Sequence, residues 1–153
     1  QKHNDLLDML LDARYDDGGE MEEAQLLDEI LILFAAGHET TSNALTFTSE
    51  LLARHPEVQT KILAEVQQLK SESSNLLDWL KNAQYIKRVI EESMRLYPPA
   101  YFIDRINKED DEFNDMILPK GSNLLFSVYE IHRHPDFWEN PETFNPDRFL
   151  DEN

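Results

Sequence analysis

Residues 36–41 read AGHETT and lie at the centre of the longest helical pattern in the chain. From about Glu22 to Arg54 there is no proline, and only Gly37 interrupts the pattern. At about 1.5 Å per residue this stretch predicts one helix of roughly 50 Å. Its middle is apolar on all sides, which predicts that it is buried. A carboxylate and hydroxyls are costly in such a place unless they are paired or wetted.

The polar side chains of this segment indicate a binding function for the helix. Thr40 can donate a hydrogen bond to the carbonyl four residues earlier, which bends a helix and opens room for water. Gly37 lets a large group approach the backbone. With Glu39 beside them, such a helix can bind a small ligand such as dioxygen and supply protons to it. The alternative, which these residues leave open, is a helix whose midpoint faces solvent.

The histidines do not predict a metal site. A zinc-protease helix needs a second histidine three residues after the glutamate of His38-Glu39, and Ser42 stands there. His132 and His134 alternate in a proline-bounded loop, and the chain has no cysteine. We therefore expect these two histidines to make hydrogen bonds or to face solvent rather than to hold a metal.

The composition limits the class of protein. A chain of 153 residues with 41% hydrophobic content suffices for one folded domain. Because 14 Lys and Arg stand against 31 Asp and Glu, the formal net charge is −17, which makes nucleic acid and anionic lipid poor partners. The absence of cysteine excludes disulfides and thiol nucleophiles. The longest apolar stretch, Ile30 to Gly37, is far shorter than the roughly 20 residues of a membrane span, so we expect a soluble segment.

Two further motifs have little meaning when taken alone. Glu92 and Arg95 are spaced i, i+3 and are therefore neighbours on one helical turn, as in many exposed ion pairs. NPDRF, residues 145–149, is a turn that presents Arg148, which can complete an Arg, Glu, Arg cluster if the tail folds back onto the helix. The remaining elements are helices at about 6–11, 56–70 and 76–96 with a break near residue 82, strands at 101–105 and 123–128 with a turn at 118–121, and a proline-rich meander.

The order of these segments resembles that of the cytochrome P-450 family. The run from Ile30 to Asn43 resembles the oxygen-binding helix of that family, and VIEESMRLYPP, residues 89–99, resembles its Glu-x-x-Arg helix with the prolines that follow. LPKG at 118–121 and the segment 132–149 resemble its strand turn and its meander. The resemblance covers essentially the whole chain. It implies a mainly α fold with a small antiparallel β part, as part of a cytochrome P-450 fold.

By this resemblance, residues 1–153 are a single partial domain, an internal fragment that runs from the oxygen-binding helix to the meander. The N-terminal part of the fold would precede Gln1, and the loop with the haem-binding cysteine would follow Asn153. The fragment alone is therefore expected to be inactive, with no metal ligand of its own. The segment would be cytoplasmic, or membrane-anchored and facing the cytoplasm.

The activity implied for the parent protein is that of a haem-thiolate monooxygenase. It would insert one atom of dioxygen into an apolar organic substrate, with haem (iron protoporphyrin IX) as cofactor. Electrons would come from NAD(P)H through a redox partner protein or a fused reductase. The alternatives are a peroxygenase of the same fold, against which Glu39 and Thr40 argue, and a non-catalytic helical interaction domain.

The resemblance also implies residue roles. Glu39 would relay protons, and Thr40 would hydrogen-bond the bound dioxygen. Arg105 would hold a haem propionate. The other implied groups are the haem contacts Ala36, Gly37 and Thr40, the structural ion cluster of Glu92, Arg95 and Arg148, and the substrate pocket of Phe34, Ala35, Ala36, Ala100, Tyr101 and Phe102.

Overall fold

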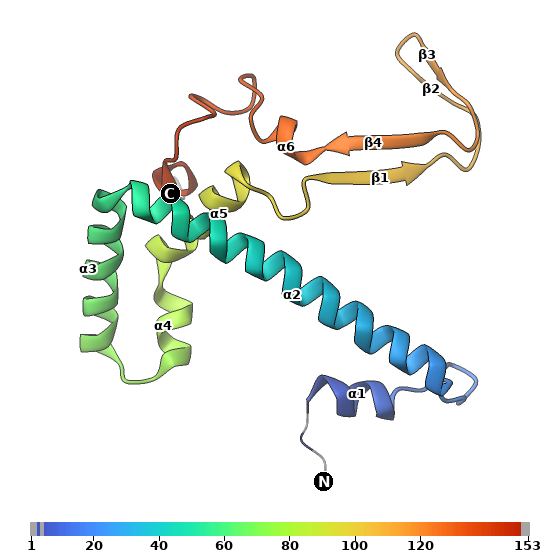
Figure 1. Ribbon diagram of the computed structural model, residues 1–153, viewed down its shortest axis with the longest axis horizontal. Coiled ribbons are helices and arrows are strands. Elements are labelled where there is room, and N and C mark those ends of the chain that lie inside the picture. The colour runs from blue at the N-terminus through green and yellow to red at the C-terminus, as the bar shows by residue number, and fades with distance from the viewer. Residues whose placement is uncertain (1–2, 4, 151–153) are drawn as a thin grey trace. The chain divides into compact units, whose positions relative to one another are not determined.

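The computed structural model describes residue 3 and residues 5–150 (Figure 1). The chain divides into two compact units, residues 1–42 and 43–153, and helix α2 passes from one into the other. No helix among the described residues is long and apolar enough to cross a membrane. The elements are α1 (Leu6–Asp12), α2 (Glu23–Arg54), α3 (Pro56–Glu72), α4 (Leu76–Asn82), α5 (Gln84–Leu96), β1 (Phe102–Ile106), β2 (Asp111–Phe113), β3 (Met116–Leu118), β4 (Asn123–Ser127), α6 (Val128–Ile131) and the 3₁₀ helix η1 (Pro146–Phe149).

The first unit contains α1 and most of α2. Asp5 caps α1, because its side chain accepts the N–H of Asp8 at 3.0 Å. Apolar side chains of the two helices line a groove of about 340 Å³. The predicted burial of the middle of α2 is wrong for this chain, since residues 31–43 are all exposed. A helix of seven residues such as α1 is too short to cover all sides of a long helix.

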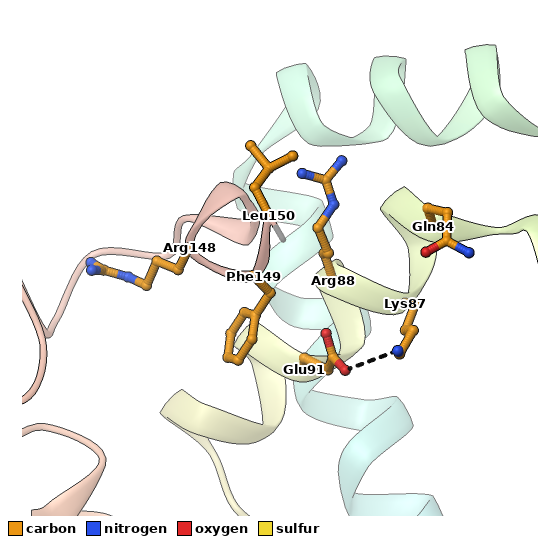
Figure 2. Close-up of a pocket in the computed structure, with 7 residues that line it drawn as sticks. All are labelled: Gln84, Lys87, Arg88, Glu91, Arg148, Phe149 and Leu150. Atoms are coloured by element: carbon orange, nitrogen blue, oxygen red, sulfur yellow. Dashed lines mark ion pairs between the residues drawn. The ribbon is translucent and has the colours of Figure 1, made fainter. Parts of the chain in front are cut away.

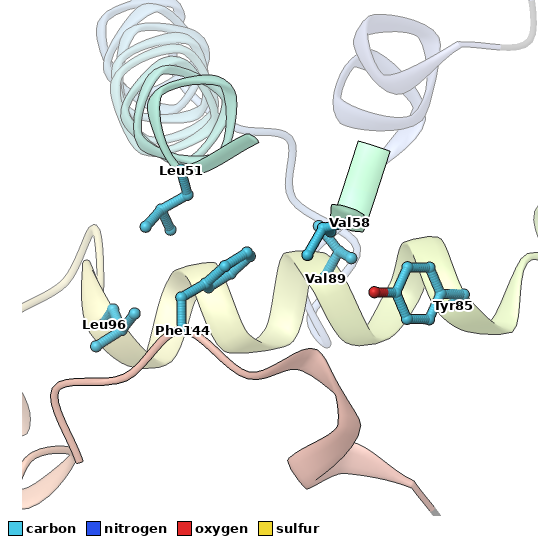
Figure 3. Packing of buried hydrophobic residues seen from close by; sticks show 6 residues of the cluster. All are labelled: Leu51, Val58, Tyr85, Val89, Leu96 and Phe144. Atoms are coloured by element: carbon cyan, nitrogen blue, oxygen red, sulfur yellow. The ribbon is translucent and has the colours of Figure 1, made fainter. Parts of the chain in front are cut away.

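The core lies in the second unit, where the end of α2, α3, α5 and the tail meet. Pro56 begins α3 at its first turn, where its missing N–H costs nothing. Val89 of α5 is 1% exposed at the centre of this core. Figure 3 shows its members, which are Leu51, Val58, Tyr85, Val89, Leu96 and Phe144.

The start of α5 is capped from another helix. The predicted break near residue 82 is confirmed, because α4 ends at Asn82 and α5 begins at Gln84. α5 has no side-chain cap of its own. Instead, the carboxylate of Glu65 in α3 accepts the N–H of Tyr85 at 2.7 Å and that of Ile86 at 2.9 Å. A carboxylate at a helix N-terminus satisfies free N–H groups and faces the positive end of the helix dipole.

Replacing Glu65 by alanine is expected to lower the free energy of unfolding by about 1–2 kcal/mol, because two N–H groups of α5 lose their acceptor. Chemical denaturation followed by circular dichroism measures the change. Gln67→Ala, an exposed substitution on the same helix, is the matched control and should change stability by less than about 0.5 kcal/mol. Equal effects of the two substitutions would show that Glu65 does not cap α5.

The β part consists of two antiparallel pairs. β1 pairs with β4 so that Phe102 lies opposite Ser127, and β2 pairs with β3. The predicted turn at 118–121 is present, with Gly121 at a φ of 83°, but it connects β3 to β4. The β2–β3 hairpin was not predicted, because its strands have three residues each and β2 carries two acidic residues. The mainly helical fold with small antiparallel sheets confirms the predicted fold class.

Candidate functional site

A buried ion pair on α5 is the centre of the second unit. Arg95 donates from Nε to Oε2 of Glu92 at 2.7 Å and from Nη2 to Oε1 at 2.9 Å, in a bidentate geometry. The side chains of Arg95 and Glu92 are 1% and 0% exposed. This pair is therefore fully desolvated, unlike the exposed helix pairs that share its spacing.

The remaining donors of Arg95 hold the tail of the chain. Nη1 donates to the carbonyls of His132 at 2.7 Å and Pro141 at 2.8 Å, and Nη2 donates to the carbonyl of Thr143 at 3.3 Å. All five N–H groups of the guanidinium thus have acceptors. Its central carbon also lies 5.1 Å from the centre of the Trp138 ring. The guanidinium of Arg95 thus holds the backbone of the irregular meander at three carbonyls.

Glu92 makes the corresponding contacts with η1. Its Oε1 accepts from Nε of Arg148 at 3.2 Å and from the backbone N–H of Asn145 at 2.8 Å. Arg148 also donates from Nη2 to the carbonyl of Asn140 at 2.7 Å. The structure therefore brings together the three residues of the expected ion cluster. The backbone acceptors were not predicted, because every residue has a backbone carbonyl and the sequence does not indicate which of them will accept a hydrogen bond.

A second set of ion pairs, also not predicted, joins η1 to two helices. Asp147 accepts from Nζ of Lys61 in α3 and from Nη1 of Arg88 in α5, each at 3.1 Å. The hydrogen bond to Asp147 raises the pKa of Lys61, and burial raises the pKa of Tyr85, over whose ring both cations lie. Figure 2 shows the neighbouring cleft of about 460 Å³, lined by Gln84, Lys87, Arg88, Glu91, Arg148, Phe149 and Leu150.

The AGHETT segment, residues 36–41, lies in the part of α2 that belongs to the first unit. Thr40 donates from Oγ1 to the carbonyl of Ala36 at 2.6 Å, and Ser42 donates to the carbonyl of His38 at 2.7 Å, as expected for hydroxyls within a helix. A Cβ placed on Gly37 would meet nothing within 4 Å. The helix therefore presents an open surface at this point.

Helical geometry divides the candidate residues of this segment between different faces. Ala36, Gly37 and Thr40 share one face, which consists of small side chains. Glu39 lies about 100° from Thr40 around the helix axis, and Ala35 lies about 140° away. Neither side chain shares the face of Thr40, so any proton passing from Glu39 to Thr40 needs a water between them.

Phe34 has contacts in another direction. Its ring stacks on His38 with centroids 5.6 Å apart, and its side chain lines the groove between α2 and α1. In the second unit, Ala100, Tyr101 and Phe102 are exposed at the start of β1, and the rings of Tyr101 and Phe102 meet edge to face at 4.8 Å. The six candidate pocket residues are thus split between the two units, and their grouping in one pocket stays a prediction.

Arg105 is the candidate ligand for a propionate. It lies in β1 opposite Leu124, is exposed, and donates from Nη1 to the carbonyl of Asp104 at 2.6 Å. No carboxylate in the described part of the chain lies within ion-pair distance of Arg105. Its guanidinium therefore retains donors that can bind an anionic group.

Comparison with known proteins agrees with this geometry. The profile described as Cytochrome P450 matches residues 1–153. Cyclooctat-9-en-7-ol 5-monooxygenase of Streptomyces melanosporofaciens is 34% identical over 149 residues, which are 97% of this chain and 32% of that protein. Human cytochrome P450 3A5 is 36% identical over 97% of this chain and 31% of its own length. The solved structure of retinoic acid bound cyanobacterial CYP120A1 superposes with a TM-score of 0.93 at 33% identity, over 99% of this chain and 35% of that one.

The chain belongs to the cytochrome P450 family. It spans about a third of the length of the curated relatives that it matches. The family uses haem, whose iron is held in these proteins by a cysteine thiolate. The residues present fit part of such a site, because Arg105 offers free donors to an anion and the face around Gly37 is open. The chain itself contains no cysteine that could bind the iron.

Proposed function

We propose that this chain is part of a haem-thiolate monooxygenase that inserts one atom of dioxygen into an apolar substrate. The observation that carries the proposal is the open face of α2 formed by Ala36, Gly37 and Thr40, with the carboxylate of Glu39 on the next face. Small side chains allow a flat group to approach the helix, and a hydroxyl at the centre of that face can contact a small polar ligand. Both units would belong to one partial domain.

Two polar residues of the segment, Glu39 and Thr40, are proposed to supply protons. Bound haem would supply the activation of dioxygen and the transfer of an oxygen atom. Thr40 donates its own proton to Ala36 O, so its Oγ1 lone pairs can accept a hydrogen bond from water. Rotation of this hydroxyl away from Ala36 then presents a donor to a ligand on the open face. Glu39 can replenish that proton. Because the side chains of Glu39 and Thr40 do not face each other, the proton would pass through a water molecule.

Arg105 would hold the cofactor from the β part of the molecule. Its planar guanidinium suits a propionate carboxylate, and no carboxylate in the described part of the chain competes for it at ion-pair distance. The cluster of Glu92, Arg95 and Arg148 would have a structural role, because its donors and acceptors are occupied by the chain itself. Electrons would come from NAD(P)H through a redox partner or a fused reductase.

The proposed substrate class is a small apolar molecule. The names of two relatives, cyclooctat-9-en-7-ol 5-monooxygenase and the pentalenene oxygenase of Streptomyces avermitilis, specify oxidation of apolar molecules, and the solved structure contains retinoic acid. Phe34, Ala100, Tyr101 and Phe102 have the apolar side chains that such a substrate requires. These residues are proposed to contribute to the substrate pocket of the full-length protein.

Haem loading and turnover of the full-length protein test the proposal. We expect a spectrum typical of thiolate ligation and an oxygenated product that requires both dioxygen and reduced nicotinamide. The 153-residue chain is expected to give no such spectrum, because it contains no thiol. A thiolate-type spectrum from this chain alone would contradict the assignment. Product formation with peroxide but not with dioxygen and reductant would indicate a peroxygenase instead.

A further inference from the structure

One face of the ribbon formed by β1 and β4 combines a cation with apolar side chains. The two strands run antiparallel, with Ile103 opposite Phe126 and Arg105 opposite Leu124 (Figure 1). Side chains alternate along a strand, and residues directly opposite each other share a face of the sheet. These four side chains therefore lie on one face, and Arg105 supplies the only charge among them.

The opposite face of the ribbon carries a negative charge. It is formed by two pairs of the same register, which are Asp104 with Leu125 and Ile106 with Asn123. The carboxylate of Asp104 repels an anionic ligand on this face, whereas Arg105 attracts one on the other face. At the start of β1 the alternation ends, because the ring of Phe102 meets that of Tyr101 edge to face at 4.8 Å. Along the rest of the strand, the charges favour the face of Arg105 for a ligand with a carboxylate.

Apolar side chains extend the face of Arg105 in one direction along the strand. Ile103 precedes Arg105 by about 6–7 Å, and its Cβ lies about 4.5–5.5 Å from that of Phe126 on β4. Ile103 and Phe126 are 45% and 48% exposed, so a bound group can reach both side chains. In the other direction Asn107 follows the strand, and its side chain donates to the carbonyl of Leu118 at 3.1 Å. The apolar surface thus lies on one side of the cation only.

We propose that Ile103 and Phe126 form an apolar contact surface for the cofactor whose propionate Arg105 binds. The inference rests on the proposed function, in which that cofactor is haem. Haem carries its carboxylates at one edge of a flat apolar macrocycle, so a cation next to two apolar side chains matches both parts of it. Contact with the macrocycle removes the exposed apolar area of Ile103 and Phe126 from water, which stabilises the bound state. Phe126 thereby extends the cofactor site from β1 to β4.

The rate of haem dissociation from the full-length holoenzyme tests the proposal, measured as transfer of haem to an excess of an acceptor apoprotein. Phe126→Ala removes most of the apolar contact on β4 and is expected to release haem roughly tenfold faster. Leu125→Ala is the matched control, because Leu125 lines the same groove of about 430 Å³ as Phe126 but belongs to the opposite face of the ribbon. This control should release haem at less than about twice the wild-type rate.

A second pair of variants repeats the test on β1 with one residue type. Ile103→Ala is expected to release haem at least about fivefold faster. Ile106→Ala, on the opposite face, should stay within about twofold of the wild-type rate. Circular dichroism of the haem-free proteins shows whether each variant is folded, and the pair on β1 carries the test if Phe126→Ala does not fold.

The outcomes separate this inference from the proposed function. Equal dissociation rates for the variants of the two faces would overturn the inference, because the contact surface would not be confined to the face of Arg105. Wild-type rates for both Phe126→Ala and Ile103→Ala would overturn it as well, while haem binding and the proposed function would stand. A wild-type protein that loads no haem would overturn the proposed function, and this inference with it.

Discussion

Replacing Arg95 by alanine is expected to abolish stable haem incorporation by the full-length protein, rather than merely to slow turnover. The substitution leaves the carboxylate of Glu92 buried at 0% exposure without its bidentate partner, at a cost of about 3–5 kcal/mol. It also frees the carbonyls of His132, Pro141 and Thr143, which Arg95 holds together. This cost is a large fraction of the roughly 5–15 kcal/mol that stabilises a typical domain, and the freed carbonyls add to it, so a folded and loaded protein is not expected.

The yield of soluble protein and its haem content per polypeptide measure this effect. Arg95→Lys should fail as well, because one ammonium with three donors cannot replace five donors in a planar fork. Lys87→Ala is the matched control on the same helix, since Lys87 forms an exposed i, i+4 pair with Glu91 at 3.7 Å. That variant should load haem normally. A fully loaded Arg95→Ala protein would show that the buried pair is no more important than this exposed one.

The sequence predicted the pair of Glu92 and Arg95 but not its importance. Spacing i, i+3 places two side chains on one turn, and that is equally true of exposed pairs. What distinguishes this pair is burial and a set of backbone acceptors contributed by the meander, more than 35 residues further along the chain. Neither property is encoded locally. The resemblance to a family supplied the expectation that the residues themselves left open.

Local signals were reliable where a local cause determines the structure. Proline at position 56 and the break near residue 82 gave correct helix boundaries, and the back-bonding of Thr40 follows from its position in a helix. The burial predicted for the middle of α2 was wrong, because burial depends on what packs against a helix. The cap that Glu65 provides for α5 was missed for the same reason, since the N–H groups that its carboxylate accepts lie about 20 residues away in the sequence.

Replacing Thr40 by alanine in the full-length protein is expected to uncouple reductant consumption from product formation. The substitution removes a hydroxyl that, in the described part of the chain, bonds to the carbonyl of Ala36 in its own helix, so little packing is lost. Binding of dioxygen and uptake of electrons should therefore continue. Without a positioned donor on the open face of α2, protons are no longer delivered in the way that leads to cleavage of the O–O bond. Reduced dioxygen should then leave as hydrogen peroxide. We expect the product formed per reduced nicotinamide to fall at least about tenfold, with a matching rise in peroxide.

Two variants separate the role of the hydroxyl from the effect of its backbone hydrogen bond. Ser42→Ala removes a bond of the same kind, from Oγ to the carbonyl of His38, on the far side of the helix from Thr40. This control should retain normal coupling. Thr40→Ser keeps the hydroxyl and should retain most of the coupling, whereas supplied peroxide should support activity of Thr40→Ala better than dioxygen and reductant do. Wild-type coupling in Thr40→Ala would remove this residue from proton delivery and leave Glu39 and water as the only route, although membership of the family would stand.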